Sequence, residues 1–82
     1  MYTMKQWNES GKPFSEFAKA KNEVDEEIFY YFLEVLPPHY NRSGIMQVGE
    51  PFTHIKGIPA FETFTYSHGK YFYVGIVTSQ RS

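Results

Sequence analysis

Side chains capable of acid–base or metal chemistry are few and scattered in this sequence. The three histidines, His39, His54 and His68, are far apart and do not form the HxH or HExxH spacing typical of a metal site. Glu50 and His54 are close enough in sequence to meet as a carboxylate–imidazole pair, which could serve as acid and base. No nucleophile motif and no glycine-rich phosphate loop is present. We therefore expect a protein that is not an enzyme and uses no cofactor or metal, with a small enzyme acting through Glu50 and His54 as an alternative.

Length and composition limit what the chain can be. With 82 residues it has room for one domain and one modest core. Its 8 basic and 9 acidic residues nearly cancel, which argues against a protein held to nucleic acid by bulk charge. It has no cysteine for a disulfide or a thiolate metal site. The start, MYTMKQWNES, lacks a signal-peptide pattern and no apolar run reaches membrane-spanning length, so we expect a soluble cytoplasmic protein without a membrane partner.

Two helices are predicted in the first half of the chain. Residues 1–11 are mostly polar with a few large apolar side chains, which indicates an N-terminal arm or a short strand. A first helix is predicted near 13–21, because a proline suits its first turn and lysines suit its last. A second is predicted near 23–36, where apolar side chains recur with helical spacing until Pro37 ends the helix. The side chains that it should bury are Phe29, Phe32 and Leu36.

An antiparallel sheet is predicted for residues 44–78. Strands are expected at 45–48, 60–66 and 70–78, with a loop at 39–44 and a brief return to extended structure at 52–55. Two helices within residues 12–36, followed by these strands, predict an α+β fold in which the helices pack on a three-stranded antiparallel β-meander. The whole chain, 1–82, is expected to form this single domain.

The last two strands are expected to form a hairpin, because His68-Gly69 suits a two-residue turn. This turn places Ser67 opposite Lys70, Tyr66 opposite Tyr71, Phe64 opposite Tyr73 and Phe61 opposite Ile76. One face then carries mainly aliphatic and β-branched side chains: Phe61, Thr63, Thr65, Phe72, Val74 and Ile76. The other is rich in aromatic rings: Ala60, Glu62, Phe64, Tyr66, Tyr71, Tyr73 and Val77. We expect the aliphatic face to lie under the helices.

The aromatic face is therefore the expected binding surface. Tyrosine tolerates partial exposure and is favoured at protein interfaces. The predicted protein-binding residues are Phe64, Tyr66, Lys70, Tyr71 and Tyr73. The N-terminal arm, a second copy of the chain in a homodimer, or another protein could cover this face. A further alternative is a protein that binds single-stranded nucleic acid, because tyrosine rings stack on bases.

Three short blocks, Glu34–Pro38, Gly49–Pro51 and Gly69–Tyr71, resemble a family of short uncharacterised proteins encoded on bacterial mobile elements, plasmids and phages. The resemblance covers roughly the C-terminal two thirds of the chain. It implies no activity and no site residues. What it implies is a context, because small accessory proteins of such elements often bind a host protein stoichiometrically, anti-defence inhibitors among them.

Overall fold

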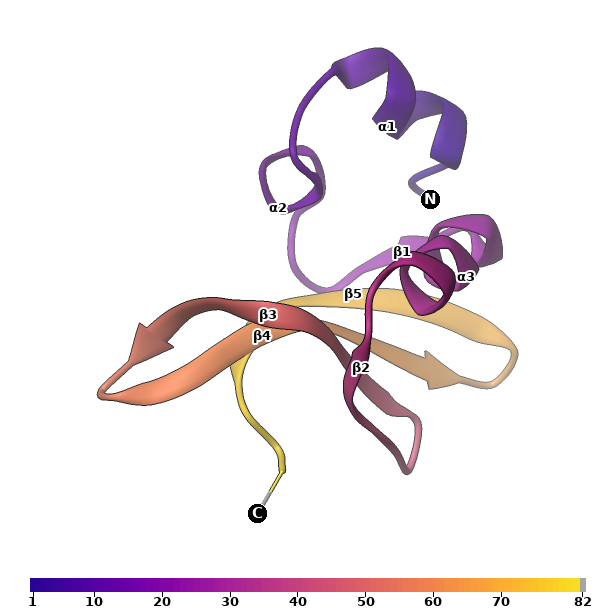
Figure 1. Ribbon diagram of the computed structural model, residues 1–82. Coiled ribbons are helices and arrows are strands. Elements are labelled where there is room, and N and C mark those ends of the chain that lie inside the picture. Colours follow the sequence, from indigo (N-terminus) through magenta and orange to yellow (C-terminus); the bar gives the residue numbers. More distant parts are fainter. Residues whose placement is uncertain (82) are drawn as a thin grey trace.

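The computed structural model of the protein describes residues 1–81 and contains one twisted, five-stranded antiparallel sheet with three short helices on one side (Figure 1). The strands are β1 (Asn22–Val24), β2 (Pro38–Arg42), β3 (Ile45–Ile55), β4 (Ile58–Ser67) and β5 (Lys70–Thr78), in the order β1-β5-β4-β3-β2. The helices are α1 (Met4–Ser10), α2 (Phe14–Phe17) and α3 (Glu26–Val35). The fold is α+β, but the predicted three-stranded meander with two helices is wrong, because two further strands and one further helix are present.

Helix α1 takes the place of the predicted arm or strand. Thr3 caps it, because its Oγ1 accepts a hydrogen bond from the backbone N–H of Gln6 at 3.2 Å and the Gln6 side chain accepts one from the Thr3 N–H at 3.0 Å. Trp7 attaches the helix to the core: its ring stacks on Phe32, and its indole N–H donates to the carbonyl of Lys12 at 2.9 Å. A local cap and one aromatic anchor therefore order a segment that looks polar in sequence.

Strand β1 replaces the start of the second predicted helix, and the first predicted helix is shorter than expected. Helix α2 ends at Phe17, and Lys21 adopts a left-handed conformation with φ 68° before the chain extends. Asn22 then lies opposite Tyr73, so β1 closes an edge of β5 that would otherwise be open. Asp25 caps α3 by accepting a hydrogen bond from the Glu27 N–H at 3.2 Å.

The rest of the second predicted helix is present as α3. The helix stops at Val35, with Leu36 already extended ahead of the two prolines. Phe32 is buried as predicted, together with Ile28, whereas Phe29 and Leu36 are only partly buried against the core.

The sheet begins earlier and is longer than predicted. Residues Pro38–Arg42, predicted to be a loop, form β2 and pair with the start of β3. The strand β3 continues through the Gly-Glu-Pro sequence at 49–51, where an irregularity in pairing takes the place of the predicted bend.

The β4–β5 hairpin follows the predicted register only near its turn. His68 and Gly69 both have positive φ, 53° and 75°, as a two-residue hairpin turn requires. The pairs from Ser67↔Lys70 to Phe64↔Tyr73 are confirmed. Beyond them a bulge shifts the register by one residue, so Phe61 lies opposite Val77 and not Ile76.

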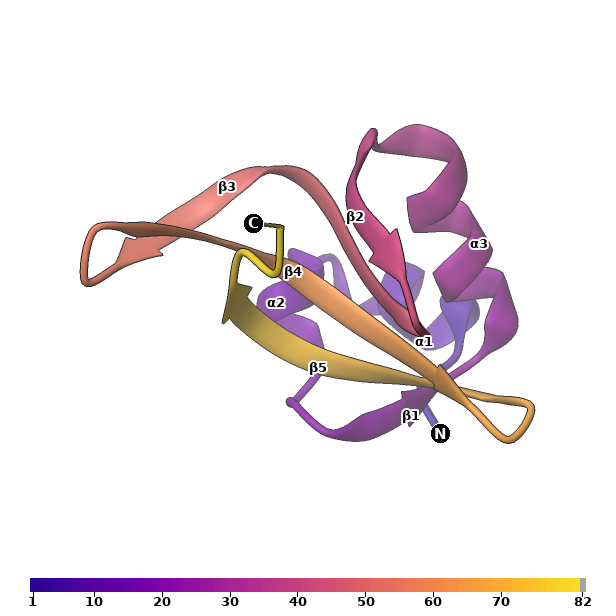
Figure 2. The ribbon, with the colours of Figure 1, turned by 90° about the horizontal axis from the view of Figure 1, so that it is seen from below.

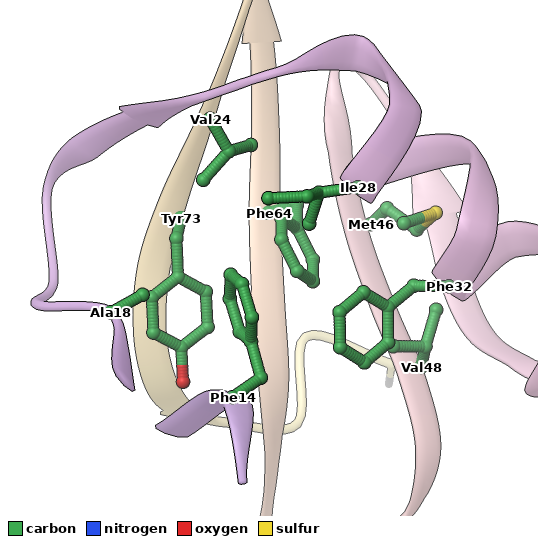
Figure 3. Packing of buried hydrophobic residues seen from close by; sticks show 9 residues of the cluster. All are labelled: Phe14, Ala18, Val24, Ile28, Phe32, Met46, Val48, Phe64 and Tyr73. Atoms are coloured by element: carbon green, nitrogen blue, oxygen red, sulfur yellow. The ribbon is translucent and has the colours of Figure 1, made fainter. Parts of the chain in front are cut away.

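The assignment of the two sheet faces is reversed from the prediction. The core beneath the helices contains Phe64 and Tyr73 from the face predicted to be exposed (Figure 3). They pack with Phe14, Ala18, Val24, Ile28, Phe32, Met46 and Val48. The physical reason is packing between rings. The helices contribute Phe14 and Phe32, whose rings contact those of Phe64 and Tyr73 at centroid distances between 4.8 and 5.7 Å.

Residues 79–81 follow β5 and lie below the opposite face of the sheet (Figure 1). Gln47 is fully buried there; its amide donates to Thr63 Oγ1 and to the carbonyls of Val77 and Thr78, and its carbonyl oxygen accepts from the Gln80 N–H at 2.9 Å. Phe61 and Thr63 are buried on this part of the sheet as well.

Candidate protein interface

The structure separates the five predicted binding residues into buried and accessible ones. Phe64 and Tyr73 are 0 % and 2 % exposed and belong to the core. Tyr66 is 49 % exposed, Tyr71 is partly buried, and Lys70 is exposed next to the β4–β5 turn. Only Tyr66, Lys70 and Tyr71 can therefore touch another molecule in this fold.

Tyr66 and Tyr71 line a groove of about 310 Å³ at one end of the sheet. The groove lies between α3 and the ends of the β2–β3 and β4–β5 hairpins, which meet at this end of the molecule (Figure 2). Its other lining residues are Phe29, Tyr30, Leu33, Asn41, Gly44 and Met46. We call this site the aromatic groove.

Packing between rings fixes the side chains of the aromatic groove. The ring of Tyr71 lies 4.5 Å from that of Phe29 and 4.9 Å from that of Tyr66, measured between centroids. A hydrogen bond of 3.2 Å joins the hydroxyls of Tyr71 and Tyr30 and so connects the sheet to α3. These contacts therefore restrict the orientation of the Tyr71 ring.

A close backbone contact between Gly44 and Tyr66 forms the side of the aromatic groove opposite α3. The Tyr66 N–H donates to the Gly44 carbonyl at 2.8 Å, and a Cβ on Gly44 would lie only 2.9 Å from the Tyr66 carbonyl oxygen. Gly44 also has φ 79° in the β2–β3 turn. Only glycine allows the turn to approach Tyr66 this closely, so Gly44 is a structural requirement of the groove.

The electrostatics of the aromatic groove suit binding better than proton transfer. The hydrogen bond to Tyr30, followed by burial and nearby charges, raises the pKa of Tyr71 to about 12. Its hydroxyl therefore stays protonated at neutral pH and can donate or accept a hydrogen bond, but it cannot serve as a phenolate base.

The exposed side of α3 is acidic. The helix and its cap carry Asp25, Glu26, Glu27 and Glu34 and no basic residue. Together with Met4, Tyr30 and Tyr31, these carboxylates surround a shallow hollow of about 490 Å³. Tyr30 lines both this hollow and the aromatic groove, so the two form one continuous surface.

Sequence reasoning missed the contribution of α3 to this surface. Tyr30 and Leu33 are exposed and lie beside the predicted helical stripe, not within it. Their exposure follows from helical spacing, but their approach to Tyr66 and Tyr71 depends on how α3 lies across the sheet. The one available signal was the pairing of large apolar side chains with three successive acidic residues, 25–27, on one helix.

The structure gives no support to the pair predicted as an enzyme site. Glu50 and His54 are both exposed, no hydrogen bond joins them within residues 1–81, and neither lines the groove or the hollow. His39 lies elsewhere, stacked on Phe61 with ring centroids 3.8 Å apart and hydrogen-bonded to Ser79 Oγ at 2.6 Å. Burial, then the charge of Arg81, lower the pKa of His39.

Residues 1–81 lack two features that mark particular kinds of protein. In residues 1–81, no group of three or more His, Asp or Glu side chains could hold a metal ion. None of the helices in that range is long and apolar enough to cross a membrane.

Comparisons with protein-family models, with curated protein sequences and with solved structures found no significant match to this chain. The resemblance to proteins of bacterial mobile elements therefore stays a prediction. A function can be inferred only from the geometry of the aromatic groove and of the acidic side of α3.

Proposed function

We propose that the protein is a non-enzymatic binding module, and that the aromatic groove together with the acidic side of α3 binds a basic segment of a partner protein. The observation that carries the proposal is the continuity of the two surfaces through Tyr30. The resemblance to mobile-element proteins adds one class of partner, a host protein that the chain would inhibit stoichiometrically.

The apolar half of the interaction follows from the aromatic groove. Tyr30 and Tyr66 are half exposed, and Leu33 lies beside them on α3. An aliphatic or aromatic side chain of the partner would bury its area against these rings, and tyrosines of this kind commonly dominate the energetics of interfaces. The hydroxyls of Tyr30 and Tyr71 and the amide of Asn41 offer hydrogen bonds that fix its orientation.

The charged half follows from α3. An arginine placed over Tyr30 or Tyr31 would combine a cation–π contact with a hydrogen-bonded pair to a neighbouring carboxylate. The same carboxylates repel a nucleic-acid backbone, which places the single-stranded nucleic-acid alternative second. Lys70 lines a neighbouring hollow together with Asp25 and Glu26, so it does not reverse the charge of the surface.

The test is selection from a random peptide library displayed on phage, followed by calorimetric titration of the enriched peptides. We expect the enriched peptides to combine arginine or lysine with a large apolar residue. The variant Tyr30→Ala/Leu33→Ala should weaken their binding about tenfold or more, as expected for loss of a central aromatic contact. Val35→Ala is the matched control, because Val35 lies on the same helix and is as exposed as Tyr30 but does not line the groove.

The charge contribution is tested separately with Glu27→Gln/Glu34→Gln. This variant should bind more weakly, and its affinity should depend less on salt, because exposed charges interact through screened solvent. Enrichment of peptides without basic residues would contradict the proposal. Binding of single-stranded oligothymidylate that weakens steeply with salt, without peptide binding, would favour the nucleic-acid alternative instead.

A further inference from the structure

The distal part of the β3–β4 hairpin extends away from the helices and the body of the sheet (Figures 1 and 2). Every residue from Glu50 to Ile58 is exposed, although most of this segment is regular strand. Three of its side chains are large and apolar, with Phe52 57 %, Ile55 42 % and Ile58 48 % exposed. A two-stranded ribbon that is exposed on both faces buries little area by itself and is only marginally stable.

The outer edge of β3 in this hairpin is open. Pro59, which pairs with His54, has no N–H, and its carbonyl accepts from the Ser79 N–H at 2.7 Å on the side away from β3. In an antiparallel pair, opposed residues exchange both backbone hydrogen bonds or neither, so the N–H and C=O of His54 also point outward. Phe52 lies in the irregular part of the pairing between Val48 and Thr53 and has no partner on β4; as the neighbour of the paired Thr53 in an extended strand, it also turns its N–H and C=O outward.

We propose that this open edge pairs with the same edge of a second copy, in an antiparallel, two-fold arrangement centred on Thr53. Phe52 of each copy then lies opposite His54 of the other, and these are the residues whose N–H and C=O groups point outward. Glu50 comes opposite Lys56, which follows the last residue of β3 and begins the β3–β4 turn with φ 53°, so opposite charges meet at both ends of the paired strands. A strand edge that is self-complementary in hydrogen bonds and in charge suits an isologous dimer.

The length of the open edge agrees with this register. Pairing around Thr53 uses residues 50–56 and brings Gly57 of the second copy opposite Gly49. The Gly49 N–H is already bonded to the Pro37 carbonyl at 2.9 Å, where β2 begins. The paired segment therefore ends where β2 starts to occupy the edge, and the two hairpins form a four-stranded ribbon that shields Phe52 and Ile55.

Sedimentation equilibrium of the full chain over a range of concentrations tests the dimer. We expect the wild-type mass to approach twice the 9.6 kDa of the chain as concentration rises. His54→Pro should raise the dissociation constant about tenfold or more, because it removes an outward N–H that has no partner within the chain. His54→Thr keeps the N–H and should dimerise like the wild type. Tyr30→Ala/Leu33→Ala should also dimerise normally, since the aromatic groove is a separate surface.

Charge reversal and cross-linking test the register without a proline. Glu50→Lys and Lys56→Glu should each weaken the dimer, and the double variant should restore it. Thr53→Cys should form a disulfide dimer on oxidation, because strand residues opposed without hydrogen bonds have Cα atoms about 4.5 Å apart. The chain has no other cysteine, and Ile58→Cys on β4 is the matched control that should not cross-link. A monomeric wild type at all concentrations, a dimer that survives His54→Pro, or no rescue by the double charge variant would each overturn the proposal.

Discussion

At the scale of single residues, depth beneath the helices separates tyrosines of identical chemistry. Tyr73 and Tyr66 lie on the same face of the β4–β5 hairpin, but Tyr73 packs against Phe14 with ring centroids 4.8 Å apart, whereas Tyr66 is 49 % exposed. The first is a core residue and the second lines the aromatic groove.

This difference predicts two outcomes for the same substitution. Tyr73→Ala should lower the free energy of unfolding by about 3–5 kcal/mol, because it leaves a large cavity in the core. Tyr66→Ala should lower it by less than about 1 kcal/mol, as is usual at half-exposed positions. Urea denaturation of both variants measures the two values, and equal losses would show that Tyr66 is also part of the core.

The partly buried Glu62 carboxyl gives the protein a predicted pH dependence. Burial raises its pKa above the ordinary 4.5, and the neighbouring Tyr73 hydroxyl only partly opposes this effect. Because the folded chain then holds the proton more tightly than the unfolded chain, this residue stabilises the fold most below pH 4.5 and loses that contribution as pH rises through the raised pKa. Glu62→Gln, which has no charge, should therefore gain more stability relative to the wild type at pH 7 than at pH 4.

Thermal unfolding at the two pH values measures this difference. Glu9→Gln is the control, because Glu9 is exposed on α1 and the substitution should shift both values by little. A gain for Glu62→Gln that is equal at both pH values, or larger at pH 4, would contradict the assignment.

At the scale of elements, local caps determine where the short helices begin. Helix α3 has only ten residues, so its start is sensitive to the Asp25 carboxylate that accepts the Glu27 N–H. Pairing of residues 22–24 with β5 keeps them extended, so the helix begins only after Asp25.

The cap predicts a graded response at Asp25. Asp25→Ala should destabilise the protein by about 1 kcal/mol, and Asp25→Asn should cost only a fraction of that because asparagine caps nearly as well. Circular dichroism measures the helicity of the two variants, and urea denaturation midpoints measure their loss of stability. If the two substitutions are equally harmful, the charge of Asp25 matters more than its hydrogen bond.

At the scale of the whole molecule, the end of the chain completes the second face of the sheet. The Gln80 N–H donates to buried Gln47, and Ser79 bonds both to His39 and to the Pro59 carbonyl. These contacts connect strands β2, β3 and β4 to a segment that has no regular structure of its own.

A chain that ends at Thr78 should therefore lose stability. Removal of the Gln80 N–H leaves the buried Gln47 oxygen without its donor, which costs about 1–3 kcal/mol. Gln80→Ala is the control, because it keeps the backbone N–H and should be nearly neutral. Guanidinium unfolding compares the stability of the wild type, the truncated chain and Gln80→Ala. A truncated chain as stable as the wild type would show that water replaces the hydrogen bond from Gln80 to Gln47.

The sequence by itself determined the features that depend on neighbours along the chain. The helical spacing of Ile28 and Phe32, the two prolines after Leu36 and the positive φ required at His68-Gly69 predicted α3, its end and the final hairpin with its first pairs. It also indicated that both faces of that hairpin are apolar and that tyrosines form part of an accessible surface.

Only the tertiary structure decided which face is the core and where the surface lies. The edge of β5 converts Asn22–Val24 from predicted helix to strand, and the bulge near Val74 changes the partner of Phe61. Aromatic side chains of the helices pack on Phe64 and Tyr73, and the approach of α3 unites Tyr30 with Tyr66 and Tyr71. These outcomes depend on contacts between residues distant in sequence, whose energies exceed the local preferences that a sequence pattern reports.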